Sequence, residues 1–197
     1  MRKEILDIHT HNQTTKDNAI INLPMSVLEN PGDFSPLAEK MYSAGIFPLY
    51  EGIWEDAFQQ LENIIQHPQI IAIGECGLDK RSPIPIEKQK YFLGKQIQLA
   101  ERVQKTLIIH CVHCWNELLE INKRNKTSQK HIIHGFRGKP QLAEQLLRNG
   151  FLLSFGPFFN IDSLRLCPKE SRFMETDNHK DLSIQDVLNL QKPFFTE

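Results

Sequence analysis

Short apolar runs recur along the chain, and each run has the length of a single β-strand. Most are rich in β-branched residues and do not alternate between apolar and polar positions, which is typical of parallel strands buried on both faces. The runs cover residues 5–9, 19–23, 44–49, 70–74, 106–110, 131–134, 151–155 and 172–176. The pattern therefore predicts a buried parallel sheet.

Segments with helical spacing lie between these runs. In residues 55–67, apolar side chains recur at the i, i+3 and i+4 positions that place them on one side of a helix. In residues 140–149, Pro140 suits the first helical turn and Gly150 suits the position just past the last turn. The predicted helices cover residues 34–43, 55–67, 86–104, 115–124 and 140–149.

The alternation of strands and helices predicts βαβ units, and the number of strand candidates favours a closed (β/α)8 barrel of the TIM type. We expect a single domain over residues 1–197. The chain is short for this fold, so we expect a compact or distorted barrel with reduced helices. The first helix has no room before the run at 19–23, and residues 156–171 have room for a short helix at most.

Composition and charge narrow the class of protein. Hydrophobic residues make up 40% of the chain, charged residues make up 24%, and the formal net charge is −1. These values are ordinary for a soluble globular protein and do not indicate a general affinity for nucleic acid or membranes. We find no secretory signal, no apolar stretch of the roughly 18 residues that a membrane span needs, and no disulfide framework among the four cysteines. We therefore expect a cytoplasmic protein with no membrane association and no obligate protein partner.

The first candidate for chemistry is a pair of histidines in the stretch DIHTHN, residues 7–12. His9 and His11 are two positions apart at the end of an apolar run. Residues i and i+2 of a strand point to the same face, so both imidazoles would approach one point. Histidine is the commonest metal ligand, which makes a metal site one interpretation. The alternative is a histidine pair at a solvated strand end.

Potential metal ligands also follow other apolar runs. In a (β/α)8 barrel the carboxyl ends of the strands line the active-site mouth, so residues there are expected to meet. The candidate ligands are His9, His11, Glu75, His110, His134 and Asp177. A set of this size suits two divalent ions that share a bridging carboxylate, and imidazole with carboxylate suits Zn, Mn, Fe or Ni better than Ca. Alternatively, His110 and His134 are core histidines and Asp177 caps a helix.

The motifs resemble those of the TatD-type metal-dependent hydrolases, a family within the amidohydrolase-like barrel group. They occur in the order found in that family and cover almost the whole chain. The motifs are DIHTH, SAGIFP, IGECGLD, LIIHC, HIIHGFRGKPQLAEQLLRNGFLLSFG and ETD.

The resemblance implies two metal sites that share Glu75. The first site would be formed by His9, His11, Glu75 and Asp177, and the second by Glu75, His110 and His134. Asp177 and Glu75 would be the catalytic carboxylates, and Asp177 would orient or deprotonate the attacking water. The family includes DNases, some of them 3′–5′ exonucleases. We therefore expect a phosphodiesterase or deoxyribonuclease that uses two divalent ions, Mg, Mn or Zn, and takes DNA or another phosphoester as its substrate.

Two departures from the family pattern keep alternatives open. Phe47 stands in GIFP where the family often has a histidine, and residues 191–197 do not resemble the usual terminal helix, so a truncated or altered C-terminus is one interpretation. The alternatives are a hydrolase of other small esters, amides or lactones on the same metals, and a catalytically weak member that acts as a binding protein.

Further polar residues near the motifs are candidates for substrate contacts. Arg137, which follows His134, could hold a phosphate through its guanidinium, and His113 and His179 could also touch the substrate. Arg137 could equally form a surface salt bridge. We expect Asp79 to orient a loop or a ligand. We expect the cysteines of CVHC (111–114) to be packed thiols, because neither a second cysteine pair nor a thioredoxin-like context accompanies them.

Overall fold

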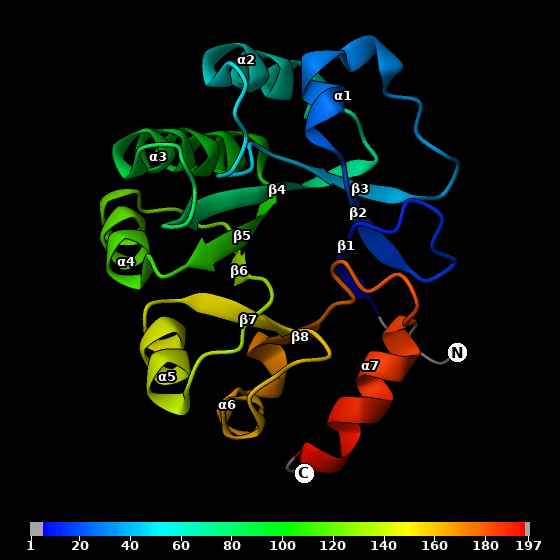
Figure 1. The fold of residues 1–197 in the computed structure, drawn as a ribbon, viewed down its shortest axis with the longest axis vertical. Coiled ribbons are helices and arrows are strands. Elements are labelled where there is room, and N and C mark those ends of the chain that lie inside the picture. Colours follow the sequence, from blue (N-terminus) through cyan, green and yellow to red (C-terminus); the bar gives the residue numbers. More distant parts are fainter. Residues whose placement is uncertain (1–5, 196–197) are drawn as a thin grey trace. The chain divides into compact units, whose positions relative to one another are not determined.

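The computed structural model describes residues 6–195 and confirms the predicted fold class. The strand order is β1-β2-β3-β4-β5-β6-β7-β8, and the strands pair in a closed parallel barrel. Figure 1 labels each of these strands. By internal contacts the chain divides into two compact units, one formed by residues 22–131 and one formed by residues 6–21 together with 132–195. Within the described residues, no helix has the length and apolar character needed to cross a membrane.

The unit of residues 22–131 is built on three consecutive parallel strands covered by helices. Helix α3 packs on β4 and β5, and Trp54, Phe58 and Phe92 form an aromatic cluster between α2 and α3. The elements are α1 (Met25–Glu29), η1 (Pro31–Asp33), β3 (Met41–Ala44), α2 (Trp54–Ile64), β4 (Ile70–Asp79), α3 (Ile86–Val103), β5 (Thr106–Val112) and α4 (Trp115–Arg124).

The other unit contains the first and last strands of the chain. Strand β1 pairs in parallel with β2 and with β8, and β8 pairs with β7. Its elements are β1 (Asp7–Thr10), β7 (Phe151–Phe155), β8 (Arg172–Met174), α5 (Pro140–Arg148), α6 (Ile161–Leu166), η2 (Lys169–Ser171), α7 (Ile184–Gln191) and η3 (Lys192–Phe194). Strands β2 (Ala19–Asn22) and β6 (His131–Ile133) each cross the boundary between the units.

The predicted helix at 34–43 is wrong. Residues up to Lys40 form turns, and Met41–Ala44 form β3, which pairs with β4. Pro36 disfavours a helix here because it lacks a backbone N–H and pushes the residue before it toward extended backbone. The apolar spacing has another origin, since the Phe34 ring packs edge-on against Tyr42, 5.6 Å between centroids. The predicted strand at 44–49 accordingly lies about three residues too far along the chain.

The remaining elements follow the sequence more closely. Among the described residues, no helix lies between β1 and β2, and residues 156–171 hold only the short helices α6 and η2, as expected. Near the C-terminus, α7 is followed by η3, which ends at Phe194. Residues 1–5 and 196–197 lie outside the described residues, and so do the start of the predicted run at 5–9 and the end of the segment 191–197.

Gly77 of β4 cannot carry a side chain where it lies. It is in register with His110 of β5, its φ is 147°, and an added Cβ would lie 1.9 Å from the backbone oxygen of His110. We expect Gly77→Ala to lower the free energy of unfolding by about 3 kcal/mol or more, measured by urea denaturation. Gly32→Ala is the control, because nothing lies within 4 Å of its added Cβ, and we expect a change within about 0.5 kcal/mol. Equal losses in the two variants would contradict this account of β4.

His131 makes the fold sensitive to acid. It is 3% exposed at the start of β6, with Nδ1 2.8 Å from Asn122 Oδ1, and burial lowers its pKa from 6.5 to about 4. Between these two pH values the unfolded chain binds a proton that the folded chain does not, so stability falls as the pH falls. We expect His131→Gln to lose about 2 kcal/mol less stability than the wild type between pH 7 and pH 5, measured by urea denaturation with chelator present. Parallel pH profiles would contradict this prediction.

Candidate metal centre

Asp177 is held beside the two histidines of β1 by backbone hydrogen bonds. Its N–H donates to the carbonyl oxygen of His9 (2.9 Å), and its own carbonyl oxygen accepts from the N–H of His11 (3.0 Å). Asp177 has a left-handed φ of 50°, which a non-glycine residue adopts only when its surroundings impose it. The pairing therefore fixes the Asp177 carboxylate between two imidazoles.

The side chains of these residues form a compact group of potential ligands. The Nε2 atoms of His9 and His11 lie 3.8 Å and 3.7 Å from Asp177 Oδ1, and the two rings meet edge to face. One ligand atom from each residue can be chosen so that all three lie within 4.8 Å of one another. His9 is fully buried, whereas the His11 and Asp177 side chains are 29% and 19% exposed, so the group is open to solvent on one side.

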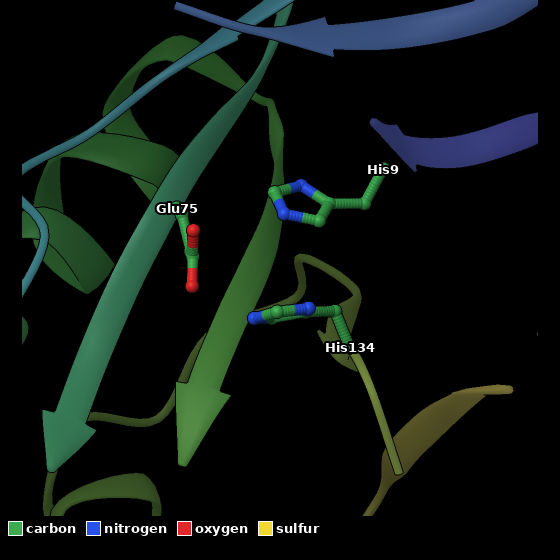
Figure 2. Close-up of side chains that lie close together, drawn as sticks. All are labelled: His9, Glu75 and His134. Carbon is green, nitrogen blue, oxygen red and sulfur yellow. The ribbon is translucent and has the colours of Figure 1, made fainter. Parts of the chain in front are cut away.

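His134 extends the same group from the end of β6. Its ring centroid lies 4.3 Å from that of His9, and Figure 2 shows the two rings close together. Its Nδ1 lies 3.3 Å from Oε1 of Glu175, which also accepts a hydrogen bond from the backbone N–H of Gly135 (2.6 Å). The contact with Glu175 therefore fixes the direction of the His134 ring. His134, Glu175 and Asp177 also offer ligand atoms within 4.8 Å of one another.

Glu175 is fully buried, yet it is held in its charged form. Burial acts to raise its pKa, but the hydrogen bond and charge interaction with His134, together with the nearby His9, outweigh burial and leave the pKa below its usual value. A buried carboxylate behind an imidazole favours the tautomer with hydrogen on Nδ1, which presents Nε2 of His134 as the ligand atom.

Asp7, the first residue of β1, links the motif DIHTH to the motif ETD. Its carboxylate accepts hydrogen bonds from the Thr176 backbone N–H (3.1 Å) and hydroxyl (2.6 Å) and from the His9 backbone N–H (3.3 Å). Burial raises the pKa of Asp7 to about 7, although the Thr176 hydrogen bonds oppose the shift. Thr176 in turn immediately precedes Asp177, so Asp7 helps to place both the histidine motif and the aspartate.

The unit of residues 22–131 contains a second group, formed by Glu75, His110 and Asp79. His110 Nδ1 lies 2.8 Å from Glu75 Oε1, and His110 Nε2 lies 2.9 Å from Asp79 Oδ2. Glu75 projects from β4 (Figure 2), and its backbone N–H donates to the side-chain oxygen of Asn22 (2.7 Å). The expectation that Glu75 and His110 end their strands is wrong, because β4 continues to Asp79 and β5 to Val112. The longer β4–β5 ladder explains the difference, since Gly77 and Asp79 still pair with β5.

Asp79 is the carboxylate that contacts His110 on the side away from Glu75, and its predicted role in orienting a loop or a ligand stays a prediction. Burial alone would raise its pKa, but hydrogen bonds from Arg81 and His110 hold the pKa at about 2. The Arg81 guanidinium makes two of these contacts, at 3.0 Å and 2.7 Å. With Asp79 fixed on Nε2, the nitrogen that His110 presents on the Glu75 side is Nδ1.

Phe47 borders this second group. Its ring lies edge-on to the His110 imidazole, with 5.1 Å between the centroids. A histidine at this position would be polar and able to bind a ligand, whereas the phenyl ring gives His110 an apolar neighbour. The replacement noted in the sequence thus lies directly at the site.

The candidate substrate residues fall in loops. Arg137 and His179 both contact Phe158, a ring that is 59% exposed: the Arg137 Cζ lies 5.4 Å from the ring centroid and the His179 ring lies 5.1 Å from it. His113 is exposed between β5 and α4. Cys111 and Cys114 are buried free thiols whose pKa values are raised by burial, as expected for packed cysteines.

Several residues that shape the site were missed in the sequence analysis. Asp7, Glu175 and Thr176 stand inside the quoted motifs DIHTH and ETD but were given no role, and Asn22 and Phe158 were not singled out. For Asp7 a signal was present, because a carboxylate at the start of an apolar run is costly to bury unless it is hydrogen-bonded. Phe158 carried no such signal.

The donor set suits divalent metal ions. Each group combines imidazole nitrogens with carboxylate oxygens, which are ligands for Zn and Mn, and each includes a histidine held by a further carboxylate, as metal-ligating histidines usually are. His110 Nδ1 and Glu75 Oε1 are separated by 2.8 Å, which is the distance of a direct hydrogen bond. The fit to a metal therefore rests on the type of the donors and on the group of His9, His11 and Asp177, whose ligand atoms lie within 4.8 Å of one another.

The chain is similar to known metal-dependent hydrolases. Over 172 residues it is 28% identical to the uncharacterized metal-dependent hydrolase YjjV of Escherichia coli K12, covering 80% of this chain and 66% of YjjV. Over 114 residues it is 29% identical to the 3′-5′ ssDNA/RNA exonuclease TatD of Erwinia tasmaniensis, covering 56% of this chain and 44% of that protein. The match spans less than two thirds of the length of each relative.

A solved structure supports the fold. The crystal structure of YjjV from Escherichia coli K12, described as a TatD homolog, matches with a TM-score of 0.77 and 20% identity, covering 98% of this chain and 91% of that chain. The family model of the TatD related DNases matches residues 36–181, which is more than half of the chain. In agreement with the motifs, the chain therefore belongs to the TatD related DNase family.

Proposed function

We propose that this chain is a metal-dependent phosphodiesterase that cleaves nucleic acid by means of a metal-activated water, with DNA as its main substrate. The observation that carries the proposal is the group of His9, His11 and Asp177, whose ligand atoms lie within 4.8 Å of one another on a side open to solvent. The exonuclease name of the Erwinia tasmaniensis relative supports nucleic acid as the substrate over other esters, amides or lactones, and over a purely binding role.

We further propose that two divalent ions, Mg, Mn or Zn, are bound by the residues of both groups. The first ion would be held by His9, His11, Glu75 and Asp177, and the second by Glu75, His110 and His134. Support comes from the placement of His11, His134 and Asp177, which lie just past the carboxyl ends of β1, β6 and β8, where the active site of a barrel is built. It also comes from the partners of the histidines, since Asp79 and Glu175 hold His110 and His134 as orienting carboxylates do in metal sites.

The residues of the chain would have distinct roles in hydrolysis. Bound divalent ions supply a water with lowered pKa and stabilise negative charge on phosphate oxygens. Asp177, partly exposed beside His11, is placed to accept the proton of the attacking water. Glu175 and Asp79 keep the imidazoles of His134 and His110 in one tautomer and one orientation.

Substrate contacts are assigned to residues of the loops, of which Arg137 and His113 are exposed and His179 is partly exposed. Arg137 would hold a phosphate through its guanidinium, and His113 and His179 would donate to the same backbone. With a net charge of −1, the affinity for nucleic acid would come from the metals and these few local donors. We place the protein in the cytoplasm, in keeping with the free thiols among its described residues.

Removal of one candidate ligand is expected to abolish the activity. Glu75→Gln and Asp177→Asn keep side-chain size but weaken the ligand, so we expect hydrolysis of single-stranded DNA with Mn²⁺ to fall more than about 100-fold. Metal content, measured by mass spectrometry, is expected to be about two ions per wild-type chain, the number needed for a binuclear mechanism.

The matched controls are Glu87→Gln and Asp162→Asn, whose carboxylates are 78% and 76% exposed on helices. Both controls should retain wild-type activity. Hydrolysis that persists in excess chelator, or that survives in Glu75→Gln and Asp177→Asn, would overturn the proposal.

Asp79 and Glu175 are expected to influence the activity by raising the affinity of the site for the metal ion. Asp79→Asn and Glu175→Gln leave the proposed ligands in place but remove the charge that orients His110 and His134, so we expect Mn²⁺ to bind about 10- to 100-fold more weakly. Competition with a fluorescent chelator measures the affinity, and activity should recover at higher Mn²⁺ concentration. Unchanged affinity in both variants would show that these contacts serve the fold alone.

A further inference from the structure

Phe158 is a large aromatic side chain in a short loop between β7 and α6, and it is 59% exposed. Arg137 and His179, from two other loops, both contact its ring. We propose that Phe158 is a stacking platform for an unpaired nucleobase of a single-stranded nucleic acid, with Arg137 holding the adjoining phosphate. The inference rests on the proposed function, for which it names the form of the substrate and a residue that selects it.

The position of the three residues relates them to the candidate metal centre. Arg137 lies three residues after His134, and His179 lies two residues after Asp177, so both loops begin at proposed ligands. Phe158 lies three residues after the last residue of β7. All three residues therefore belong to the loops that follow the carboxyl ends of β6, β7 and β8, where the substrate of a barrel enzyme is bound.

The loops that carry these side chains are anchored by hydrogen bonds. The His179 backbone N–H donates to the carbonyl oxygen of Thr176 (2.9 Å). The Ser163 hydroxyl donates to the carbonyl oxygen of Gly138 (2.7 Å), and the Asn160 side chain accepts from the Ser163 backbone N–H (3.0 Å). On the other side of Phe158, Gln191 Nε2 donates to the carbonyl oxygen of Gly156 (3.2 Å). Phe158 thus lies between two tied points of the loop, which limits the ordering that binding requires.

The chemistry of the cluster matches that of a nucleotide. An exposed ring offers a face to any base, and stacking of this kind tolerates every base because each has a π-face. The Arg137 guanidinium, with its Cζ 5.4 Å from the ring centroid, is a charge that can both lie over a ring and bind a phosphate through a pair of N–H groups. A base and its own phosphate present these two features together.

A purely structural role is less consistent with this arrangement. The exposed Tyr91 also has a cation near its ring, Lys95, but these two residues are one turn apart on α3 and stabilise a helix face. The contacts of Phe158 come from two other loops, and burial of this ring contributes little to stability because it is 59% exposed. The two aromatic residues provide a natural comparison.

The inference predicts a preference for single strands. In a duplex the bases are already stacked and paired, so a base must be extruded before it can reach Phe158. The platform would therefore favour a frayed or unpaired end of the substrate.

Binding measurements test the inference directly. In a Glu75→Gln background, which prevents turnover, a short single-stranded oligonucleotide with 2-aminopurine is compared with the same oligonucleotide carrying abasic units. We expect Phe158→Ala to weaken binding of the base-containing strand about tenfold, to abolish stacking-dependent fluorescence quenching and to change binding of the abasic strand less than about twofold. Phe158→Trp should bind the base-containing strand and quench the fluorescence as the wild-type residue does. Tyr91→Ala is the control and should change neither the binding nor the quenching.

The outcomes separate this inference from the proposed function. Absence of any hydrolysis of the base-containing strand by the wild type with Mn²⁺ would overturn the proposed function, while the binding comparison still decides the role of Phe158. Equal effects of Phe158→Ala on the two strands, or no effect on either, would overturn the stacking platform. Arg137→Ala should weaken both strands alike, since its partner is the phosphate.

Discussion

The two backbone hydrogen bonds between Asp177 and β1 are the constraint on which the first ligand group depends. They pair the backbone of Asp177, which lies beyond the end of β8, with the backbone of β1. The left-handed φ of Asp177 costs of order 1–3 kcal/mol, so the pairing and the Asp7–Thr176 contacts beside it must hold it in place. The spacing between the imidazoles and this carboxylate is thus set by main chain, which is stiffer than any side-chain rotamer.

The same design occurs twice in the chain with different electrostatics. In each compact unit an imidazole is backed by a buried carboxylate, Glu175 behind His134 and Asp79 behind His110. Asp79 also faces the Arg81 guanidinium, which neutralises its charge, whereas Glu175 relies on a backbone N–H and the imidazoles near it. The two histidines therefore have different net charge behind them.

The sequence was sufficient to predict the fold class, because continuous apolar runs identify buried strands. The structure brings ligand atoms of His9, His11 and Asp177 within 4.8 Å of one another, and the role of these residues as metal ligands stays a prediction. The helix at 34–43 failed because spacing alone does not distinguish a helix face from residues that pack on a turn and a strand, and Pro36 should have decided the matter. The extent of β4 past Glu75 depends on pairing with β5, and the meeting of Phe158 with Arg137 and His179 depends on three loops, so neither is visible in a linear pattern.

The register of β4 and β5 also decides where two cysteines lie, one in each strand. Cys76 directly follows Glu75, and Cys111 directly follows His110, so in each strand a soft thiol alternates with a harder ligand. Both thiols are buried, and burial raises the pKa values of both, which keeps them protonated. A slip of one residue in either strand would exchange the positions of these neighbours. The strand register of this protein therefore decides which side of the sheet carries the carboxylate and the imidazole and which side carries the thiols.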